Sequence, residues 1–165
     1  MRSEAQFLAE YAVSHQNPSN QIVHMICVPV IFIASIALLW LLPVGRFIPG
    51  VPADIAPYIN VATLSLIPAL YLYARMSAHA LLVGSLWLAL SFALTLAGLK
   101  ANLPVGWIAA ASWVAAWAAQ FWGHHVEGAK PSFADDLVFL LVGPLFVQQK
   151  LNRLLATGSM QKHSH

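Results

Sequence analysis

The sequence QIVHMICVPVIFIASIALLWLLP, residues 21–43, decides the fold, because it contains no Asp, Glu, Lys or Arg. Three more uncharged runs follow at residues 55–74, 76–99 and 101–126. A helix that crosses a hydrocarbon core of roughly 30 Å needs about 20 apolar residues, and each run is long enough. The sequence therefore predicts an all-α, polytopic membrane helical bundle with about four transmembrane helices.

The composition excludes an ordinary soluble domain. Of the 165 residues, 59% are apolar and only 8% are charged, against roughly 25% charged in a typical soluble protein. Four spans use most of the chain, which predicts a single membrane-embedded domain over residues 1–165. Within it we distinguish an N-terminal segment (about 1–20), the membrane helices with a histidine site (21–147) and a polar tail (148–165).

The net charge and the cysteine content exclude some classes of function. The net charge of +2 comes from scattered residues without a basic run, so we expect no nucleic-acid partner. The single cysteine, Cys27, excludes an intramolecular disulfide and a cysteine-based metal site. The oligomeric state does not follow from the sequence.

Both ends of the membrane region have local signals. Residues 3–16 are typical of an amphipathic helix, in which Ser3 and Gln6 form a capping box. The Asn-Pro-Ser-Asn stretch at 17–20 ends that helix, and Ser19 or Asn20 is expected to cap the next one.

Two further connections follow from proline and glycine. Residues 43–57 hold four prolines and two glycines, and this composition predicts the longest loop. Near the C-terminus, Ser132 is expected to cap a short helix with Asp135 in its first turn. The apolar stretch 137–147 is too short to span a membrane and predicts a re-entrant or interfacial helix.

The basic residues set an orientation. In a four-span arrangement, one side receives Arg2, Arg75, Lys130, Lys150, Arg153 and Lys162, and the other receives Arg46 and Lys100. The positive-inside rule places both termini, and the histidines near them, in the cytoplasm. Without a Lys-Asp-Glu-Leu-type retrieval signal, we expect a multi-pass protein of a bacterial inner membrane rather than of the endoplasmic reticulum.

Seven histidines outnumber the six acidic residues. His163 and His165 fall in the polar tail, and His79 stands alone in a tight turn, where a structural role at the interface is expected. His15, His24, His124 and His125 remain. Ionisable groups that adjoin membrane spans are functional candidates because their desolvation is costly.

The spacing of these groups suits a metal site. His124 and Glu127 are three residues apart and share one face of a helix. Imidazoles and a carboxylate without a thiolate suit iron or zinc, and two histidines with one carboxylate leave open positions on ferrous iron. Histidines that are merely hydrogen-bonded at the interface are the alternative.

An aromatic stripe accompanies the second histidine group. Trp113, Trp117 and Phe121 repeat at steps of four in the fourth apolar run. This spacing indicates a packing or lipid-facing surface, with the lining of a substrate channel as the alternative.

Two motif blocks resemble a known family. YAVSHQNPSNQIVH at 11–24, followed by Val28-Pro29, resembles the opening motif of the domain of unknown function 962 family. QFWGHHVEGAKP at 120–131, followed by Asp135 and by GPLFV at 143–147, resembles its second half. That family includes a fungal endoplasmic-reticulum enzyme that shortens 2-hydroxy fatty acids during phytosphingosine breakdown.

The resemblance implies an Fe(II)-dependent dioxygenase that uses O2 on a 2-hydroxy fatty acid, releases CO2 and leaves a fatty acid one carbon shorter. The residues that it implies as metal ligands are His15, His24, His124 and Glu127. His125 is the candidate catalytic residue, and Lys130 the candidate for binding the substrate carboxylate. Lys150 is an alternative to Lys130, and both lysines also suit a role as interfacial anchors.

Three other functions compete with the dioxygenase. One is a haem-binding membrane electron carrier with two axial histidines, and another is a non-catalytic membrane scaffold or small transporter. The third is a zinc hydrolase on the same ligands. The uncharged centres of the apolar runs argue against an ion pathway.

Overall fold

The computed structural model describes residues 2–131 and 138–162, and their side chains up to residue 156. These residues form helices and no strands. The elements are α1 (Glu4–Val13), α2 (Pro18–Trp40), the 3-10 turns η1 (Val44–Phe47) and η2 (Ala56–Tyr58), α3 (Val61–Met76), α4 (Ala78–Lys100), α5 (Val105–Glu127) and α6 (Phe139–Lys162). The prediction of an all-α fold is confirmed.

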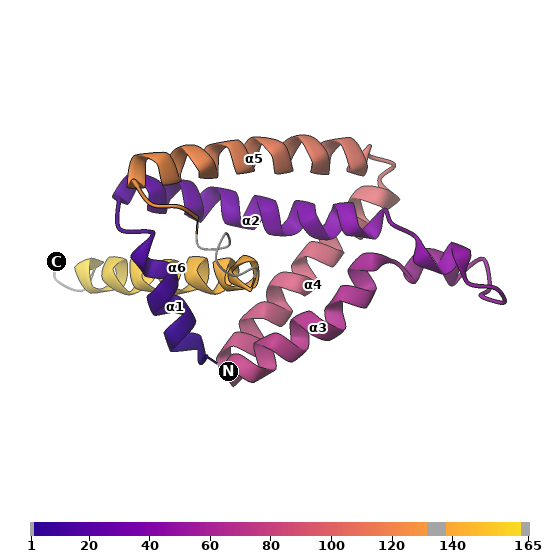
Figure 1. The fold of residues 1–165 in the computed structure, drawn as a ribbon, viewed down its shortest axis with the longest axis horizontal. Coiled ribbons are helices and arrows are strands. Elements are labelled where there is room, and N and C mark those ends of the chain that lie inside the picture. Colours follow the sequence, from indigo (N-terminus) through magenta and orange to yellow (C-terminus); the bar gives the residue numbers. More distant parts are fainter. Residues whose placement is uncertain (1, 132–137, 163–165) are drawn as a thin grey trace.

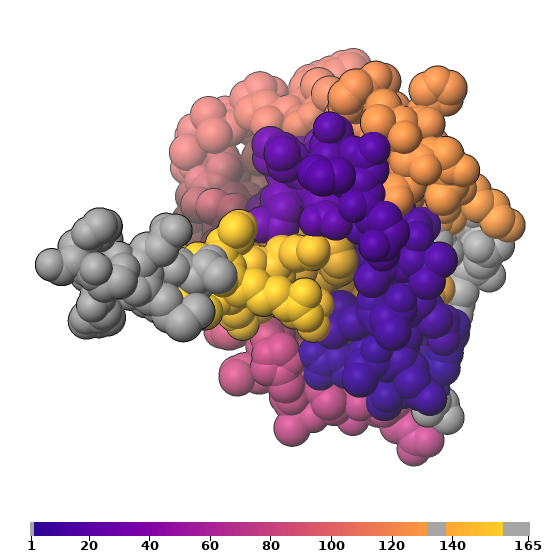
Figure 2. Space-filling model, turned by 90° about the vertical axis from the view of Figure 1, so that its left-hand side faces the viewer, coloured from indigo at the N-terminus to yellow at the C-terminus, as the bar shows by residue number. Residues whose placement is uncertain are grey.

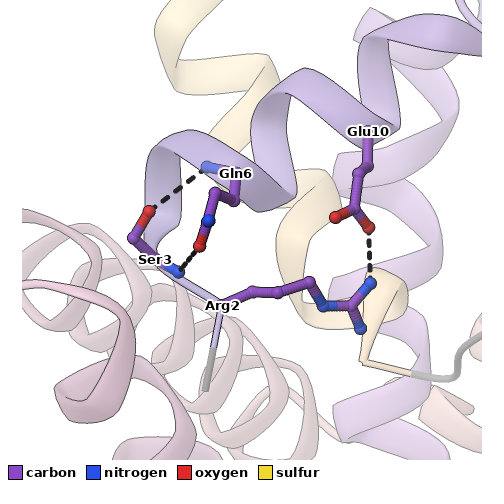
Figure 3. Close-up of polar contacts among 4 residues, drawn as sticks. All are labelled: Arg2, Ser3, Gln6 and Glu10. Carbon is purple, nitrogen blue, oxygen red and sulfur yellow. Dashed lines mark hydrogen bonds and ion pairs between the residues drawn. The ribbon is translucent and has the colours of Figure 1, made fainter.

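The first helix begins as predicted, with a capping box. The Ser3 side chain accepts a hydrogen bond from the Gln6 N–H, and the Gln6 side chain accepts one from the Ser3 N–H. Arg2 reaches past this cap to form an ion pair with Glu10 (Figure 3). Its guanidinium also lies 4.3 Å from the centre of the Phe7 ring. The N–H groups of Ser3 and Gln6 therefore find hydrogen-bond partners within the first turn of α1. The charge of Arg2 is balanced by Glu10 on the same helix.

The second helix begins two to three residues earlier than predicted. Its N-cap is Asn17, whose side chain accepts from the Ser19 N–H, and Pro18 occupies the first turn. Proline is favoured there because its missing N–H would have no helical partner. The assignment of Ser19 or Asn20 as the cap is wrong, and Asn20 is left free for another role.

The helices form two antiparallel pairs (Figure 1). α5 returns along α2, and α4 returns along α3. The loop between α2 and α3, which its prolines and glycines predict, contains the two short turns η1 and η2 and projects from one end of the molecule. α6 lies beneath α2 and is crossed by α1. The two ends of α2 therefore differ: one enters the loop, and the other lies close to α1, α5 and α6.

Two segments among the described residues are long and apolar enough to cross a membrane. They are Pro18–Phe47 and Ala78–Lys100, which contain 18-residue stretches with mean hydropathies of 2.7 and 2.1, respectively. α3 has 16 residues, or about 24 Å of helix, which is short of the hydrocarbon thickness. The bundle of four spans stays a prediction.

The C-terminal segment differs from the prediction. α6 runs from Phe139 to Lys162 as one helix through Pro144, so the expected end of the helix near residue 147 is wrong. Phe139, Val142, Leu145 and Phe146 are buried in the main hydrophobic core, and this packing stabilises the helix around the proline. The predicted cap at Ser132 and Asp135 lies outside the described residues.

Candidate metal centre

Three histidines meet at the end of α2 that lies beside α1. His15 precedes the helix, His24 lies in its second turn, and His124 comes from the last turns of α5. One ring nitrogen of each lies within 4.8 Å of one of each of the others. The residues are 2%, 1% and 5% exposed, respectively. Figure 2 views the molecule from this end, with α1 and the start of α2 facing the viewer.

Main-chain carbonyls orient two of the rings. His15 Nδ1 donates to the Tyr11 carbonyl at 2.5 Å, and His24 Nδ1 donates to the Asn20 carbonyl at 3.0 Å. The Tyr11 ring stacks on His15 with its centroid 4.1 Å away and an interplanar angle of 7°. A histidine whose Nδ1–H is fixed by a carbonyl presents Nε2 as its ligand atom. Tyr11, whose role the sequence did not indicate, therefore orients the His15 ring.

Two buried nitrogens of the cluster lack hydrogen-bond partners in the described part of the chain. His15 Nε2 and His124 Nδ1 are buried, and neither has a hydrogen-bond partner among the described residues. Such orphaned groups are rare because each costs about 1–3 kcal/mol. A divalent first-row metal ion bound by imidazoles would satisfy them. The donor set therefore fits a metal centre.

The protonation of His15 also fits a ligand. Burial, reinforced by the neighbouring His24, lowers the pKa of His15 to about 3. The imidazole is therefore neutral at physiological pH. Metal binding requires the neutral form of histidine, so no proton needs to be displaced from this ring.

Glu127 lies beside the cluster and joins the segments that carry it. Its carboxylate accepts from the main-chain N–H of Gln16 at 2.7 Å, from that of Asn17 at 2.8 Å and from the Asn20 amide at 3.0 Å. Partial burial raises its pKa, but these hydrogen bonds outweigh that effect and hold the pKa below its usual value. Glu127 thus connects the end of α5 to the turn that holds His15. Its role as a ligand stays a prediction.

Close helix approach at the same level depends on a glycine. A Cβ atom on Gly123 would lie 2.5 Å from Oδ1 of Asn20. Asn20 is fully buried, and its amide also donates to the Ser14 carbonyl at 3.1 Å. Gly123 therefore lets α5 approach α2 closely enough for His124 to meet His24.

A cavity of about 390 Å³ extends from the histidines into the bundle. His15, His24 and His124 line its polar end, and the remaining lining is mostly apolar. Its α2 lining residues continue through Val28, Ile31, Phe32, Ser35, Ile36 and Leu39. The opposing walls come from α3, α4, α5 and α6. Trp113 and Trp117 belong to this lining, whereas Phe121 is exposed. Two members of the aromatic stripe therefore line a cavity, which agrees better with the alternative interpretation of the stripe than with a purely lipid-facing surface.

The other predicted site residues lie away from this cavity. His125 and Lys130 are exposed and do not line it. Lys150 donates to the Gln21 side chain at 3.0 Å and is also outside the lining. The roles of His125 as catalytic residue and of Lys130 in substrate binding stay predictions. Gln120, which the sequence analysis did not single out, does line the cavity. Its position four residues before His124, on the same face of the helix, is the sequence signal that could have identified it.

The geometry disfavours a haem. Axial histidines lie on opposite sides of the porphyrin plane. Here the three ring centres are 4.2 to 5.0 Å apart, which leaves no space for the macrocycle between any two of them. The electron-carrier alternative therefore loses its structural basis.

Fold and site together define a helical protein with apolar helices and a buried cluster of three histidines beside an apolar cavity. The family model described as "2-hydroxy-palmitic acid dioxygenase Mpo1-like" matches residues 1–155. The chain belongs to this family, in agreement with the resemblance found in the sequence. No curated protein and no solved structure matches the chain significantly.

Proposed function

We propose that the protein is an Fe(II)-dependent dioxygenase that shortens a long-chain 2-hydroxy fatty acid by one carbon. The observation that carries this proposal is the position of three buried histidines at one end of an apolar cavity. The family description supports the substrate class. Proteins use such apolar cavities with few polar groups to bind small ligands.

His15, His24 and His124 would hold the iron, because their ring nitrogens converge. When bound, the iron supplies the activation of O2, and imidazole ligation leaves positions free for small molecules. The protein contributes the fixed ring orientations from Tyr11 and Asn20 and the apolar surroundings of the cluster. Burial also excludes bulk water from the reaction.

The acyl chain would lie along α2. From His24 to Leu39 the helix rises about 22 Å, a length that suits an extended long-chain acyl group. Each buried methylene contributes about 0.8 kcal/mol, so the apolar lining supplies affinity while the histidine end receives the polar head group. The methyl end of the acyl chain would lie near Leu39 and Leu88, which line the cavity. Next to Leu39 in the sequence, Trp40 packs edge-on against Phe92, with 5.8 Å between the ring centroids.

The reaction balances with O2 as its oxidant. The 2-hydroxy acid R–CH(OH)–COOH and one O2 give R–COOH, CO2 and H2O. The bond between C1 and C2 breaks, these two carbons lose four electrons in total, and one O2 accepts four. No additional reductant is therefore required.

We place the protein in a membrane with the histidine end at its cytoplasmic face. Two segments of sufficient length and hydropathy support membrane insertion. Leu82, Leu86, Leu90 and Leu94 form an exposed row on α4 at steps of four residues, which suits contact with lipid. A fatty acid dissolved in the bilayer would then have its chain at the depth of the cavity.

Product analysis of the iron-loaded protein tests the proposal. Protein loaded anaerobically with Fe(II) is mixed with 2-hydroxypalmitate and exposed to air, and the lipids are analysed by mass spectrometry. We expect pentadecanoate from the Fe(II) protein, and none from the Zn(II) protein or the His124→Ala variant. Folded, iron-loaded protein that forms no shortened acid would overturn the substrate assignment, and equal formation of pentadecanoate by the Zn(II) protein would overturn the assignment of iron.

A further inference from the structure

Gln120 is a buried polar residue that is not part of the histidine cluster. The residue is only 5% exposed. Its Nε2 atom is buried and has no hydrogen-bond partner among the described residues. Leaving a donor unpaired in an apolar interior is unfavourable. Its presence therefore points to a partner that arrives with a ligand.

The position of Gln120 indicates what that ligand is. Gln120 precedes His124 by four residues on α5, so the two side chains lie on one face of the helix. Both line the same cavity. The amide consequently lies one helical turn from the histidine cluster, on the side that leads into the cavity.

The charge of the cavity adds a constraint. No lysine or arginine of the described chain contributes to its lining. A carboxylate accepts hydrogen bonds through both of its oxygens and requires donors when it leaves water. The side-chain donor that the cavity lining offers to a carboxylate at the histidine end is thus the amide of Gln120, not a lysine or an arginine.

On the basis of the proposed function, we propose that the Gln120 amide donates a hydrogen bond to the carboxylate of the 2-hydroxy fatty acid. This contact fixes the head group beside the histidines and sets the preference for a carboxylate over a neutral head group. Gln120 then takes the role that the sequence assigned to Lys130.

Binding to the metal-free protein tests this assignment, because turnover does not enter the measurement. Dissociation constants of 2-hydroxypalmitate and of 1-hexadecanol are measured in detergent micelles for the wild type and for Gln120→Leu. We expect Gln120→Leu to weaken binding of 2-hydroxypalmitate by roughly tenfold or more, as for a hydrogen bond to a charged group. Binding of 1-hexadecanol should weaken much less, because a hydrogen bond to its neutral hydroxyl contributes less than one to a charged carboxylate.

Two more variants sharpen the test. Gln120→Glu keeps the shape and introduces a like charge, so it should weaken binding of the carboxylate further. Gln148→Leu is the matched control, because Gln148 lies on α6, donates to Asn152 and does not line the cavity. It should leave both dissociation constants unchanged.

Several results would overturn the assignment. Equal affinity of wild type and Gln120→Leu for 2-hydroxypalmitate would do so, as would an equal loss for both ligands, which would reveal a packing effect only. Absence of measurable 2-hydroxypalmitate binding by the metal-free wild type would also refute it. Failure of the dioxygenase proposal would appear separately, as fatty acid binding without oxygen-dependent shortening by the iron-loaded protein.

Discussion

His79 and the buried histidines are surrounded in opposite ways. His79 Nδ1 lies 2.7 Å from a carboxylate oxygen of Glu4, and its side chain is 54% exposed. Ser77 donates to the same carboxylate, so this group ties the start of α1 to the start of α4. At the other site, His15 and His124 turn buried, unpartnered nitrogens toward each other and His24.

The difference shows which histidines suit a ligand role. An exposed ion pair contributes little stability, typically below about 1 kcal/mol, and has no unsatisfied atom. A buried imidazole nitrogen without a partner carries a cost that a bound ion removes. We therefore expect substitutions at the two sites to affect different properties.

The largest contrast is expected for metal binding. His124→Ala removes one of the three converging histidines and should abolish stoichiometric iron binding, whereas His79→Ala should bind iron as the wild type does. Metal analysis after anaerobic loading and desalting measures this directly. Iron loss in His79→Ala, or full occupancy in His124→Ala, would reverse the contrast between the two sites.

The two carboxylates next to histidines should also differ. Glu127→Gln weakens the connection between α5 and the Gln16–Asn17 turn, and we expect a 10- to 100-fold loss of iron affinity, about the effect of removing a group that orients ligands. Glu4→Gln should leave the affinity unchanged. Competition with a chelator gives both values. Complete loss of iron from Glu127→Gln would instead support the predicted role of Glu127 as a ligand.

The far end of the cavity should control chain length. Leu39→Trp shortens the cavity away from the histidines, so we expect turnover of the longest 2-hydroxy acids to fall severalfold and that of shorter ones to persist. Ile26→Trp is the control on the same helix, since Ile26 is 63% exposed. Comparing rates across a series of chain lengths measures the shift. Identical profiles for Leu39→Trp and wild type would show that the chain takes another path.

The smallest effect is expected near His79. Ser77 caps α4 by accepting from the Ala80 N–H at 2.8 Å, and its replacement by alanine should lower the free energy of unfolding by about 1 kcal/mol. The midpoint temperature of unfolding should fall correspondingly by about 2 to 4 °C, which thermal unfolding in detergent can measure. Iron affinity should not change, and a parallel loss of iron would mean that the two regions are coupled.

Much of the fold followed from local patterns. The capping box at Ser3 and the helices in the uncharged runs were predictable, because caps and apolar run lengths are properties of short segments. The continuation of α6 past residue 147 was not, since it depends on Phe139 and Phe146 packing in the core across a proline. Tertiary burial there outweighs the local tendency of Gly143-Pro144 to interrupt a helix.

The sequence singled out the three histidines that the structure brings together, but it indicated less about the residues around them. His15, His24 and His124 followed from their positions beside apolar runs and from the family resemblance. The contacts of Glu127 with main-chain N–H groups and the unpaired amide of Gln120 depend on how α5 meets the turn before α2. Spacing along one helix does not show which of its neighbours a side chain meets.

The stoichiometry of a turnover with labelled substrate tests the dioxygenase proposal at the level of the reaction itself. Iron-loaded protein receives 2-hydroxypalmitate labelled at C1, and consumed O2, labelled CO2 and pentadecanoate are measured together. We expect one of each per substrate, with the entire label in CO2 and no added reductant required. Label retained in the lipid, or CO2 released without O2 consumption, would contradict it.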